Sequence, residues 1–244
     1  MIELTTRDRV AVITLERSEK RNALTVELCD RLRDAVRTAV KDGARVLVIT
    51  GEGSSFCSGA DLDAVYSDAF RGALYDMLHT VADAPVPVVA AVNGPAIGAG
   101  TQLALAADLR VAAPTAVFAI PTAKIGLAVD PWTIRRFARL AGHGTARAVL
   151  LACAQLDARQ AHACGLAERL GSIDDALTWA AEMAELAPLT VAYSKQVLNS
   201  VADAAGGEDE EALLRAFEAC WASEDFAEGR RARAERRAPR FEGR

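Results

Sequence analysis

The sequence contains no run of apolar residues approaching the roughly 20 that a helix needs to cross a bilayer. It also opens with the polar segment MIELTTRDR, which is unlike a secretory signal peptide. Both absences argue against an exported or membrane-spanning protein. We therefore expect a cytoplasmic protein that does not insert stably into membranes.

The sequence also lacks closely spaced cysteine pairs, and its histidines have no catalytic partner nearby. The five cysteines are odd in number and irregularly spaced, and they include no CxxC pair. This pattern is typical of reduced thiols, so we expect neither a disulfide framework nor a bound metal. The three histidines lack a serine or acidic partner nearby in the sequence, which favours no catalytic role for them. These residues are Cys29, Cys57, Cys153, Cys164, Cys220, His79, His143 and His162.

The chain has no excess of positive charge. Its net charge is −5 and its pI is near 5.4, which argues against nucleic acid as a general partner. The one local concentration of basic residues is the arginine cluster at 230–240. Its simplest interpretation is a solvated terminal helix followed by a frayed tail.

What the chain does contain is apolar material in a regular pattern. Its 244 residues are 51% hydrophobic, enough for one large core or for a core and a smaller helical subdomain. Apolar runs of strand length alternate with segments of helical spacing, which predicts an α/β fold with largely parallel strands. After Thr145 the pattern is almost entirely helical, with breaks at Gly165, Gly171, Pro188 and 204–209. The expected strands are 10–15, 45–50, 86–92, 109–113 and 116–120, and the expected helices include 25–42 (capped by Thr25), 70–83 and 133–141.

Two glycine-flanked turns, FCSGAD at 56–61 and NGPAIGAG at 93–100, are the most informative segments. The glycines and proline of the second turn argue against regular structure up to about Gly100, where an apolar helix follows. A helix start carries unpaired N–H groups, so the Ala99 N–H is expected to face incoming negative charge. Gly59 lets the chain turn and leaves the Ala60 N–H exposed to the same charge. Each turn alone is more often a plain turn, but two converging donors can stabilise a thioester enolate.

Together and in this order, these segments resemble the enoyl-CoA hydratase/isomerase (crotonase) superfamily. Five ordered motifs spread over the whole chain carry the resemblance: 15–26, 46–62, 88–100, 126–142 and 223–241. It implies a crotonase-like spiral of ββα units, with a core and acyl-CoA pocket at 1–187 and a C-terminal helical trimerisation region at 188–244. It also implies homotrimers or dimers of trimers, and a coenzyme A thioester as ligand without any further cofactor.

The resemblance also assigns residues to the ligand. The thioester oxygen lies between the N–H groups of Ala60 and Ala99, and the C-terminal arginines of the same or a neighbouring subunit approach the CoA phosphates, where arginine binds well. The other positions expected to bind acyl-CoA are Arg21, Ala23, Ser58, Gly59, Asp61, Leu62, Gly98 and Trp132.

The chain departs from the family at its proton carriers. Hydratases of the family use two glutamates on one water, and the matching positions here are Gln102 and Thr122. Neither an amide nor a hydroxyl titrates near neutral pH, so a normal hydratase mechanism lacks its acid and its base. Gln102 can still hold a water or a substrate group by hydrogen bonds.

One carboxylate remains in the matching segment, at Asp130. Relatives that isomerise dienoyl-CoA or displace an aryl halide use an aspartate at this position as base or nucleophile. The simpler interpretation is a helix N-cap, because Pro131 suits the first helical position and 133–141 has helical spacing. The two roles are compatible. Trp132 reduces the space for the acyl group if it faces inward, and otherwise packs in the core.

Two function classes follow. The first is a protein that binds fatty acyl-CoA without normal hydration. It is similar to homologues from mycolic-acid-producing actinobacteria that lack both glutamates, bind long-chain acyl-CoA and serve fatty-acid synthesis. The resemblance therefore implies enzymes of fatty-acid synthesis as partners. The second is an isomerase or hydrolase that runs on Asp130. Weak hydratase activity, with water held by Gln102, is a third possibility. Binding is the hypothesis we favour.

Overall fold

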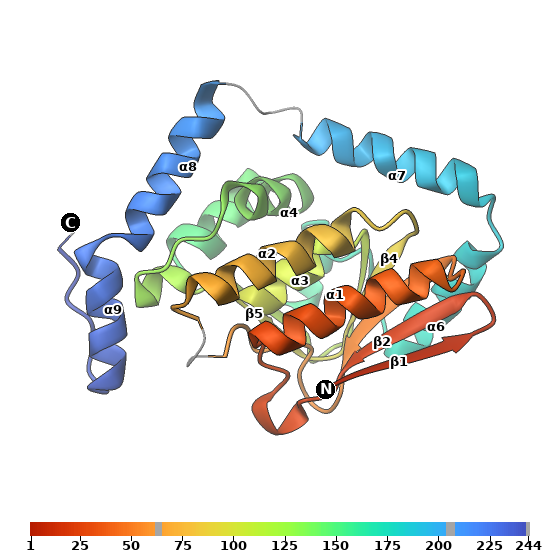
Figure 1. The fold of residues 1–244 in the computed structure, drawn as a ribbon, viewed down its shortest axis with the longest axis horizontal. Coiled ribbons are helices and arrows are strands. Elements are labelled where there is room, and N and C mark those ends of the chain that lie inside the picture. Colours follow the sequence, from red (N-terminus) through yellow and green to blue (C-terminus); the bar gives the residue numbers. More distant parts are fainter. Residues whose placement is uncertain (62–64, 204–207, 243–244) are drawn as a thin grey trace.

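The computed structural model of the chain describes residues 1–61, 65–203 and 208–242, and its main feature is a twisted sheet covered by helices on both faces (Figure 1). The strand order in this sheet is β1-β2-β3-β4-β6-β9, and every neighbouring pair except β1 and β2 is parallel. The predicted α/β class with largely parallel strands is therefore confirmed. The strands are β1 (Ile2–Arg7), β2 (Val10–Leu15), β3 (Val46–Gly51), β4 (Val88–Val92), β6 (Leu109–Ala112) and β9 (Arg169–Leu170).

A smaller sheet, in the order β5-β7-β8, lies beside the first. Its strands are β5 (Pro95–Ile97), β7 (Val117–Ala119) and β8 (Gln155–Asp157). The prediction of irregular structure up to Gly100 was wrong here, because Pro95 begins a strand that pairs with β7 and helix α3 already starts at Ala99. The prediction of an almost entirely helical chain after Thr145 also missed β8 and β9, which have three and two residues.

Helices cover the two faces of the larger sheet. Helix α1 packs with α2 and α3 on one face, while α6 covers the other face against Val46, Val48 and Val89. Because parallel strands are buried on both sides, β3 and β4 are continuous apolar runs. The helices are α1 (Val26–Lys41), α2 (Asp68–Ala82), α3 (Ala99–Ala106), α4 (Pro131–Leu151), α5 (Ala158–Ala163), α6 (Ile173–Ala184), α7 (Pro188–Asp203), α8 (Glu208–Trp221) and α9 (Glu224–Ala234), with the short 3₁₀ helices η1 (Ser18–Lys20) and η2 (Thr122–Ile125).

Helix ends follow the predicted caps. Thr25 caps α1 by accepting the Leu28 N–H at 3.1 Å, and Asp130 caps α4 by accepting the Thr133 N–H at 2.8 Å. Helix α4 continues beyond the predicted 133–141, but Gly142 breaks its helical geometry with φ of 79°. A residue with a side chain rarely adopts that angle, so glycine allows the bend.

The C-terminal helices are attached to the core by specific contacts. In α7, the Lys195 ammonium is 8% exposed and lies 2.7 Å from an Asp108 carboxylate oxygen. Helix α9 packs directly on η2, where a Cβ at Gly229 would overlap the Ile125 carbonyl oxygen. Figure 1 shows α8 and α9 on the side of the molecule where α2 begins, with α7 on the opposite side. Within the described residues, no helix combines the length and apolarity needed to cross a membrane.

Several apolar side chains of α8 and α9, in the region expected to form the trimer, pack within the chain. Phe217 is 8% exposed and contacts the rings of Tyr75 and Trp221. Phe226 contacts Trp221 as well. Leu214 is 45% exposed, and the side chain of Leu213 lies outside the described residues. Five of the exposed large apolar side chains lie on or just before α7: Leu186, Leu189, Tyr193, Val197 and Leu198.

Candidate functional site

The two glycine-flanked turns run against each other, backbone to backbone. The Cys57 N–H donates to the Pro95 carbonyl at 3.1 Å, and the Ile97 N–H donates to the Cys57 carbonyl at 3.0 Å. Glycine makes this approach possible. Gly59 has φ of 100°, and a Cβ there would lie only 2.7 Å from the Ile97 carbonyl oxygen. The sequence therefore brings the two turns together through backbone contacts that larger residues would prevent.

Ala60 and Ala99 follow these contacts. Ala60 forms a parallel β-bridge with Leu24. The two hydrogen bonds of this bridge run from the Leu24 N–H to the Gly59 carbonyl and from the Asp61 N–H to the Leu24 carbonyl, so the Ala60 N–H takes part in neither. Ala99 is the first residue of α3, after Gly98 as its N-cap. A first-turn N–H has no acceptor inside its own helix, and the helix dipole favours negative charge there. Both residues line one small cavity.

This small cavity has a volume of about 160 Å³ and gathers most of the predicted site. Its walls come from the two turns, from α2, from η2 and from the segment before α4. Apolar side chains such as Phe70, Leu74 and Val129 form much of the lining. The predicted site residues in its lining are Ser58, Gly59, Ala60, Gly98, Ala99, Gln102 and Thr122.

Gln102 belongs to a polar network at the wall of this cavity. The Gln102 side-chain amide donates to the Thr133 hydroxyl at 2.9 Å and, at 3.4 Å, to Oδ2 of Asp130. The Thr133 hydroxyl donates to the same Asp130 oxygen at 2.7 Å. Oδ1 of Asp130 accepts the Thr133 N–H. Both oxygens of Asp130 are thus engaged by the chain itself, as its cap interpretation predicts.

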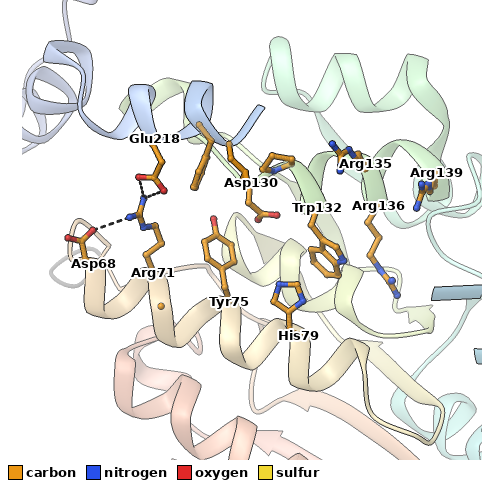
Figure 2. A pocket seen from close by; sticks show the side chains of 14 residues that line it. Asp68, Arg71, Tyr75, His79, Asp130, Trp132, Arg135, Arg136, Arg139 and Glu218 are labelled. Atoms are coloured by element: carbon orange, nitrogen blue, oxygen red, sulfur yellow. Dashed lines mark hydrogen bonds and ion pairs between the residues drawn. The ribbon is translucent and has the colours of Figure 1, made fainter. Parts of the chain in front are cut away.

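Asp130 and Trp132 line a second, larger cavity of about 710 Å³ between α2, α4 and α8 (Figure 2). Trp132 lies beside His79, with ring centroids 5.4 Å apart, and the Arg136 guanidinium carbon lies 5.4 Å from the Trp132 ring centroid. Figure 2 shows the Tyr75 hydroxyl pointing toward the Asp130 carboxylate. The structure therefore separates these two predicted site residues from the cavity that contains Ala60 and Ala99.

Arg71 and Tyr75, both on α2, line both cavities, and the sequence interpretation missed them. The Arg71 guanidinium binds both carboxylate oxygens of Glu218 at 3.0 and 3.2 Å and lies 5.0 Å from the Trp221 ring centroid. Burial, followed by the charge of Asp130 and a hydrogen bond to it, raises the pKa of Tyr75 well above its usual range. Tyr75 is thus a neutral hydrogen-bond donor at neutral pH. The signal available in the sequence was the spacing of Arg71 and Tyr75, which are four residues apart and therefore lie on one face of a helix.

The remaining predicted ligand contacts that the structure describes lie outside the linings of these two cavities. Arg21 is exposed at the end of η1, and Ala23 is buried next to the bridge with Ala60. The Asp61 carboxylate lies 2.7 Å from the Arg17 guanidinium. Leu62 lies outside the described residues.

Cys57 and some of the C-terminal arginines make contacts within the chain. Burial raises the pKa of the Cys57 thiol to about 12, so it stays protonated and acts as a packed apolar group. Arg237 pairs with Glu228 on α9, and Arg231 does so at 3.2 Å. The hydrogen bond from Arg237 is the main reason that the pKa of Glu228 falls to about 2. The predicted terminal helix is confirmed as α9, and the tail after it is held by Glu228 through the Arg240 N–H at 2.9 Å.

Known proteins share both the sequence pattern and the arrangement. The sequence model described as enoyl-CoA hydratase/isomerase matches residues 5–244. Over 247 residues and the full length of both chains, the sequence is 48% identical to the probable enoyl-CoA hydratase echA6 of Mycobacterium bovis.

Solved structures agree with the sequence comparison. Methylmalonyl-CoA decarboxylase in complex with 2-nitronate-propionyl-CoA superposes with a TM-score of 0.91 at 25% identity, covering 100% of this chain and 98% of the other. An enoyl-CoA hydratase/isomerase from Pseudoalteromonas atlantica T6c gives 0.89 at 30% identity, covering 99% of each chain.

Proposed function

Because this chain belongs to the enoyl-CoA hydratase/isomerase family and has the crotonase fold, we propose that it binds fatty acyl-CoA thioesters without normal hydratase turnover. The thioester oxygen lies between the N–H groups of Ala60 and Ala99, at the wall of the small cavity. Two backbone donors placed before the ligand arrives stabilise an oxyanion without reorganisation. Ser58, Gly59 and Gly98 shape the same wall.

One observation carries this proposal: among the residues that the structure describes, Gln102 and Thr122 on the cavity wall offer no proton carrier. Gln102 and Thr122 line the cavity with the two alanines, and neither side chain titrates near neutral pH. The nearby carboxylate, Asp130, caps α4 and accepts hydrogen bonds from Thr133 and Gln102. The ligand is therefore held at its carbonyl by groups that do not transfer protons to water.

Turnover by Asp130 is the alternative proposal. An isomerase or hydrolase of this kind needs the Asp130 carboxylate to leave its hydrogen bonds and reach past Gln102 or Tyr75 into the small cavity. The names of similar proteins support a third proposal, weak hydration with a water held by Gln102. Because both carboxylate oxygens of Asp130 already accept hydrogen bonds from the chain, we favour acyl-CoA binding over these two kinds of turnover.

The proposal also covers the ligand class, the oligomeric state, the cellular location and the partners. The similar decarboxylase holds a CoA ligand, which supports coenzyme A thioesters as the ligand class. The exposed apolar side chains around α7 support assembly as a trimer or a dimer of trimers. We also propose that the protein is cytoplasmic, that its core ends at residue 187 and its C-terminal helical region begins at 188, and that enzymes of fatty-acid synthesis are its partners. The further residues proposed to contact the ligand are Arg21, Ala23, Asp61, Leu62, Trp132 and the C-terminal arginines.

The test compares two ligands that differ only at the carbonyl. Calorimetric titration with butyryl-CoA and with S-butyl-CoA, its thioether, measures the contribution of the Ala60 and Ala99 donors. At about 0.5–1.5 kcal/mol for each of the two hydrogen bonds, we expect the thioester to bind roughly 5- to 150-fold more tightly.

A variant assigns that difference to α3. Ala99→Pro removes one N–H at a first helical position, where proline is well tolerated, and should bring the two affinities closer together. Circular dichroism checks its fold. Equal binding of the two ligands by the wild-type protein would refute the proposal.

A further inference from the structure

The direction of the Ala60 N–H is set by the carbonyl on the other side of its peptide bond. The Gly59 carbonyl accepts the Leu24 N–H at 2.8 Å. A trans peptide group is planar and holds its C=O and N–H in opposite directions, and the described residues include no cis peptide bond. The Ala60 N–H therefore points away from Leu24, which leaves it available to a ligand in the small cavity that Ala60 lines.

Glycine makes this direction dependent on support from outside the turn. Gly59 has φ of 100° and, without a side chain, gives little resistance to rotation of the peptide that follows it. Such a rotation would turn the Ala60 N–H away from the ligand and bring the Gly59 carbonyl oxygen toward it. An oxygen at that place repels the thioester oxygen instead of binding it. The oxyanion site therefore needs contacts that hold residues 59–61 against residues 23–24.

Arg17 supplies such a contact from beside the bridge. Its Nη1 donates to the Ala23 carbonyl at 2.9 Å and to Oδ2 of Asp61 at 2.7 Å. Ala23 directly precedes Leu24 in the chain, and Asp61 directly follows Ala60. One guanidinium nitrogen thus binds both of the paired segments, next to the residues that form the bridge.

The Arg17 side chain is also held at its base. The Arg17 N–H donates to the Asn22 side-chain oxygen at 3.0 Å, and the Arg17 carbonyl accepts the Asn22 N–H at 2.9 Å. The buried Asn22 amide donates in turn to the Ser55 carbonyl at 2.8 Å, directly before the first glycine-flanked turn. The side chains of Arg17 and Asp61 are only 24% and 17% exposed, so salt screens their attraction less than that of a surface pair.

We propose that Arg17 is a positioning residue of the oxyanion site: by holding Asp61 beside Ala23, it keeps the Ala60 N–H directed at the thioester oxygen. This inference rests on the proposed function, because it takes Ala60 to be one of the two donors. Arg17 is not among the described residues that line the small or the larger cavity. It therefore acts through Asp61 and the bridge, without touching the acyl group.

The test compares butyryl-CoA with S-butyl-CoA, the thioether that lacks the carbonyl, in wild type and in Arg17→Met. Calorimetric titration gives the ratio of the two dissociation constants. A loss of folded protein or of a contact to the CoA moiety weakens both ligands alike and leaves this ratio unchanged. If Arg17 positions the Ala60 N–H, Arg17→Met should lower the ratio about 2- to 12-fold, which is the contribution of one neutral hydrogen bond.

Arg33 on α1 offers a matched control. Its Nη1 lies 2.7 Å from Oδ1 of Asp30, and its side chain is 22% exposed, close to the value for Arg17. Neither Arg33 nor Asp30 lines the two cavities. Arg33→Met should therefore keep the wild-type ratio. Arg17→Lys should keep more of the ratio than Arg17→Met, because a lysine ammonium still donates to oxygen acceptors.

Asp61→Ala removes the other end of the contact, and it replaces Arg17→Met if that variant does not fold. It should lower the ratio to the same extent. The double variant Arg17→Met/Asp61→Ala should lower it no further, because either change alone already breaks the contact.

The outcomes distinguish the two proposals. A folded Arg17→Met that keeps the wild-type ratio overturns the role of Arg17 and leaves the proposed function intact, and a folded Asp61→Ala with that ratio does the same. A wild-type ratio near one overturns the proposed function instead.

Discussion

The Gln102 side-chain nitrogen lies 3.4 Å from Oδ2 of Asp130 and 2.9 Å from the Thr133 hydroxyl oxygen. The Gln102 amide donates hydrogen bonds here, whereas an ionised glutamate at this position would have no hydrogen to donate and would face the Asp130 carboxylate. Gln102 and Asp130 are therefore two parts of one arrangement, and a glutamate at position 102 would disturb it.

Gln102→Glu tests this coupling through stability. Repulsion from Asp130 and partial burial should raise the pKa of the new carboxyl above its unfolded value. The destabilisation is then largest at pH values above the raised pKa and disappears below the unfolded pKa. We expect the melting temperature of Gln102→Glu, relative to wild type, to recover as the pH falls from 8 to 5. In Gln102→Glu/Asp130→Asn the deficit should be smaller at every pH, and a deficit independent of pH would contradict the coupling.

Asp130 is expected to act as a cap and network acceptor rather than as a catalyst. Asp130→Ala removes the acceptor of the Thr133 N–H and should cost about 0.5–2 kcal/mol of unfolding free energy. Asp130→Asn keeps that acceptor and should cost less. Chemical denaturation measures both. Product formation from dienoyl-CoA and saturated acyl-CoA is measured in parallel, and wild-type turnover that disappears in Asp130→Asn would instead make the chain an enzyme.

Helix α9 supports the η2 segment that carries Thr122, and this support depends on Gly229. A methyl group there would overlap the Ile125 carbonyl oxygen, so α9 has to move away from η2. We expect Gly229→Ala to cost about 1–3 kcal/mol of unfolding free energy. Gly144 is a matched control in α4, because a Cβ there has open space. Gly144→Ala should be neutral or stabilising by up to about 1 kcal/mol. Equal effects of the two substitutions would show that α9 does not pack tightly.

Glu228 makes the attachment of the C-terminal tail dependent on pH. The hydrogen bond from Arg237 is the largest of the contributions that lower its pKa from 4.5 to about 2. A lowered folded-state pKa gives stability that is complete above the unfolded value of 4.5 and is lost as the pH falls toward about 2. The difference in denaturation midpoint between wild type and Glu228→Gln should be constant above pH 4.5 and shrink below it. A difference that grows in acid would contradict this assignment.

The parts of the fold that were predicted from sequence have strong local signals. The apolar runs of β2, β3 and β4 and the caps at Thr25 and Asp130 depend on neighbouring residues only, and the structure confirms them. Strands β8 and β9 were missed because they are short and not apolar, so only pairing with β7 and β6 makes them strands. Strand β5 was hidden by the glycines and proline around it.

The same distinction applies to the site. The two turns with Ala60 and Ala99 were recognised from an ordered motif, and the structure places both residues at one cavity. The contacts of Arg71 and Tyr75, which line both cavities, were not predicted, because they join segments that are far apart in the sequence. Arg71 and Glu218 are 147 residues apart in sequence. A single sequence carries no signal for such a pairing. Asp130 was expected in the ligand pocket, but its place on the far side of Gln102 depends on how α4 packs against α3.

The most direct test of the account follows binding and chemistry in one experiment. Wild-type protein is titrated with crotonyl-CoA while bound ligand is measured by calorimetry and loss of the conjugated enoyl thioester by absorbance. General acid and base groups each contribute about 10²–10⁴ in rate, and the positions expected to carry them hold Gln102 and Thr122. We predict saturable binding with an enoyl absorbance that stays nearly constant, and Gln102→Glu/Thr122→Glu/Asp130→Asn should raise the rate of hydration. Turnover on the order of hundreds per second by the wild-type protein, within the usual range of efficient enzymes, would contradict the central claim, as would the absence of binding.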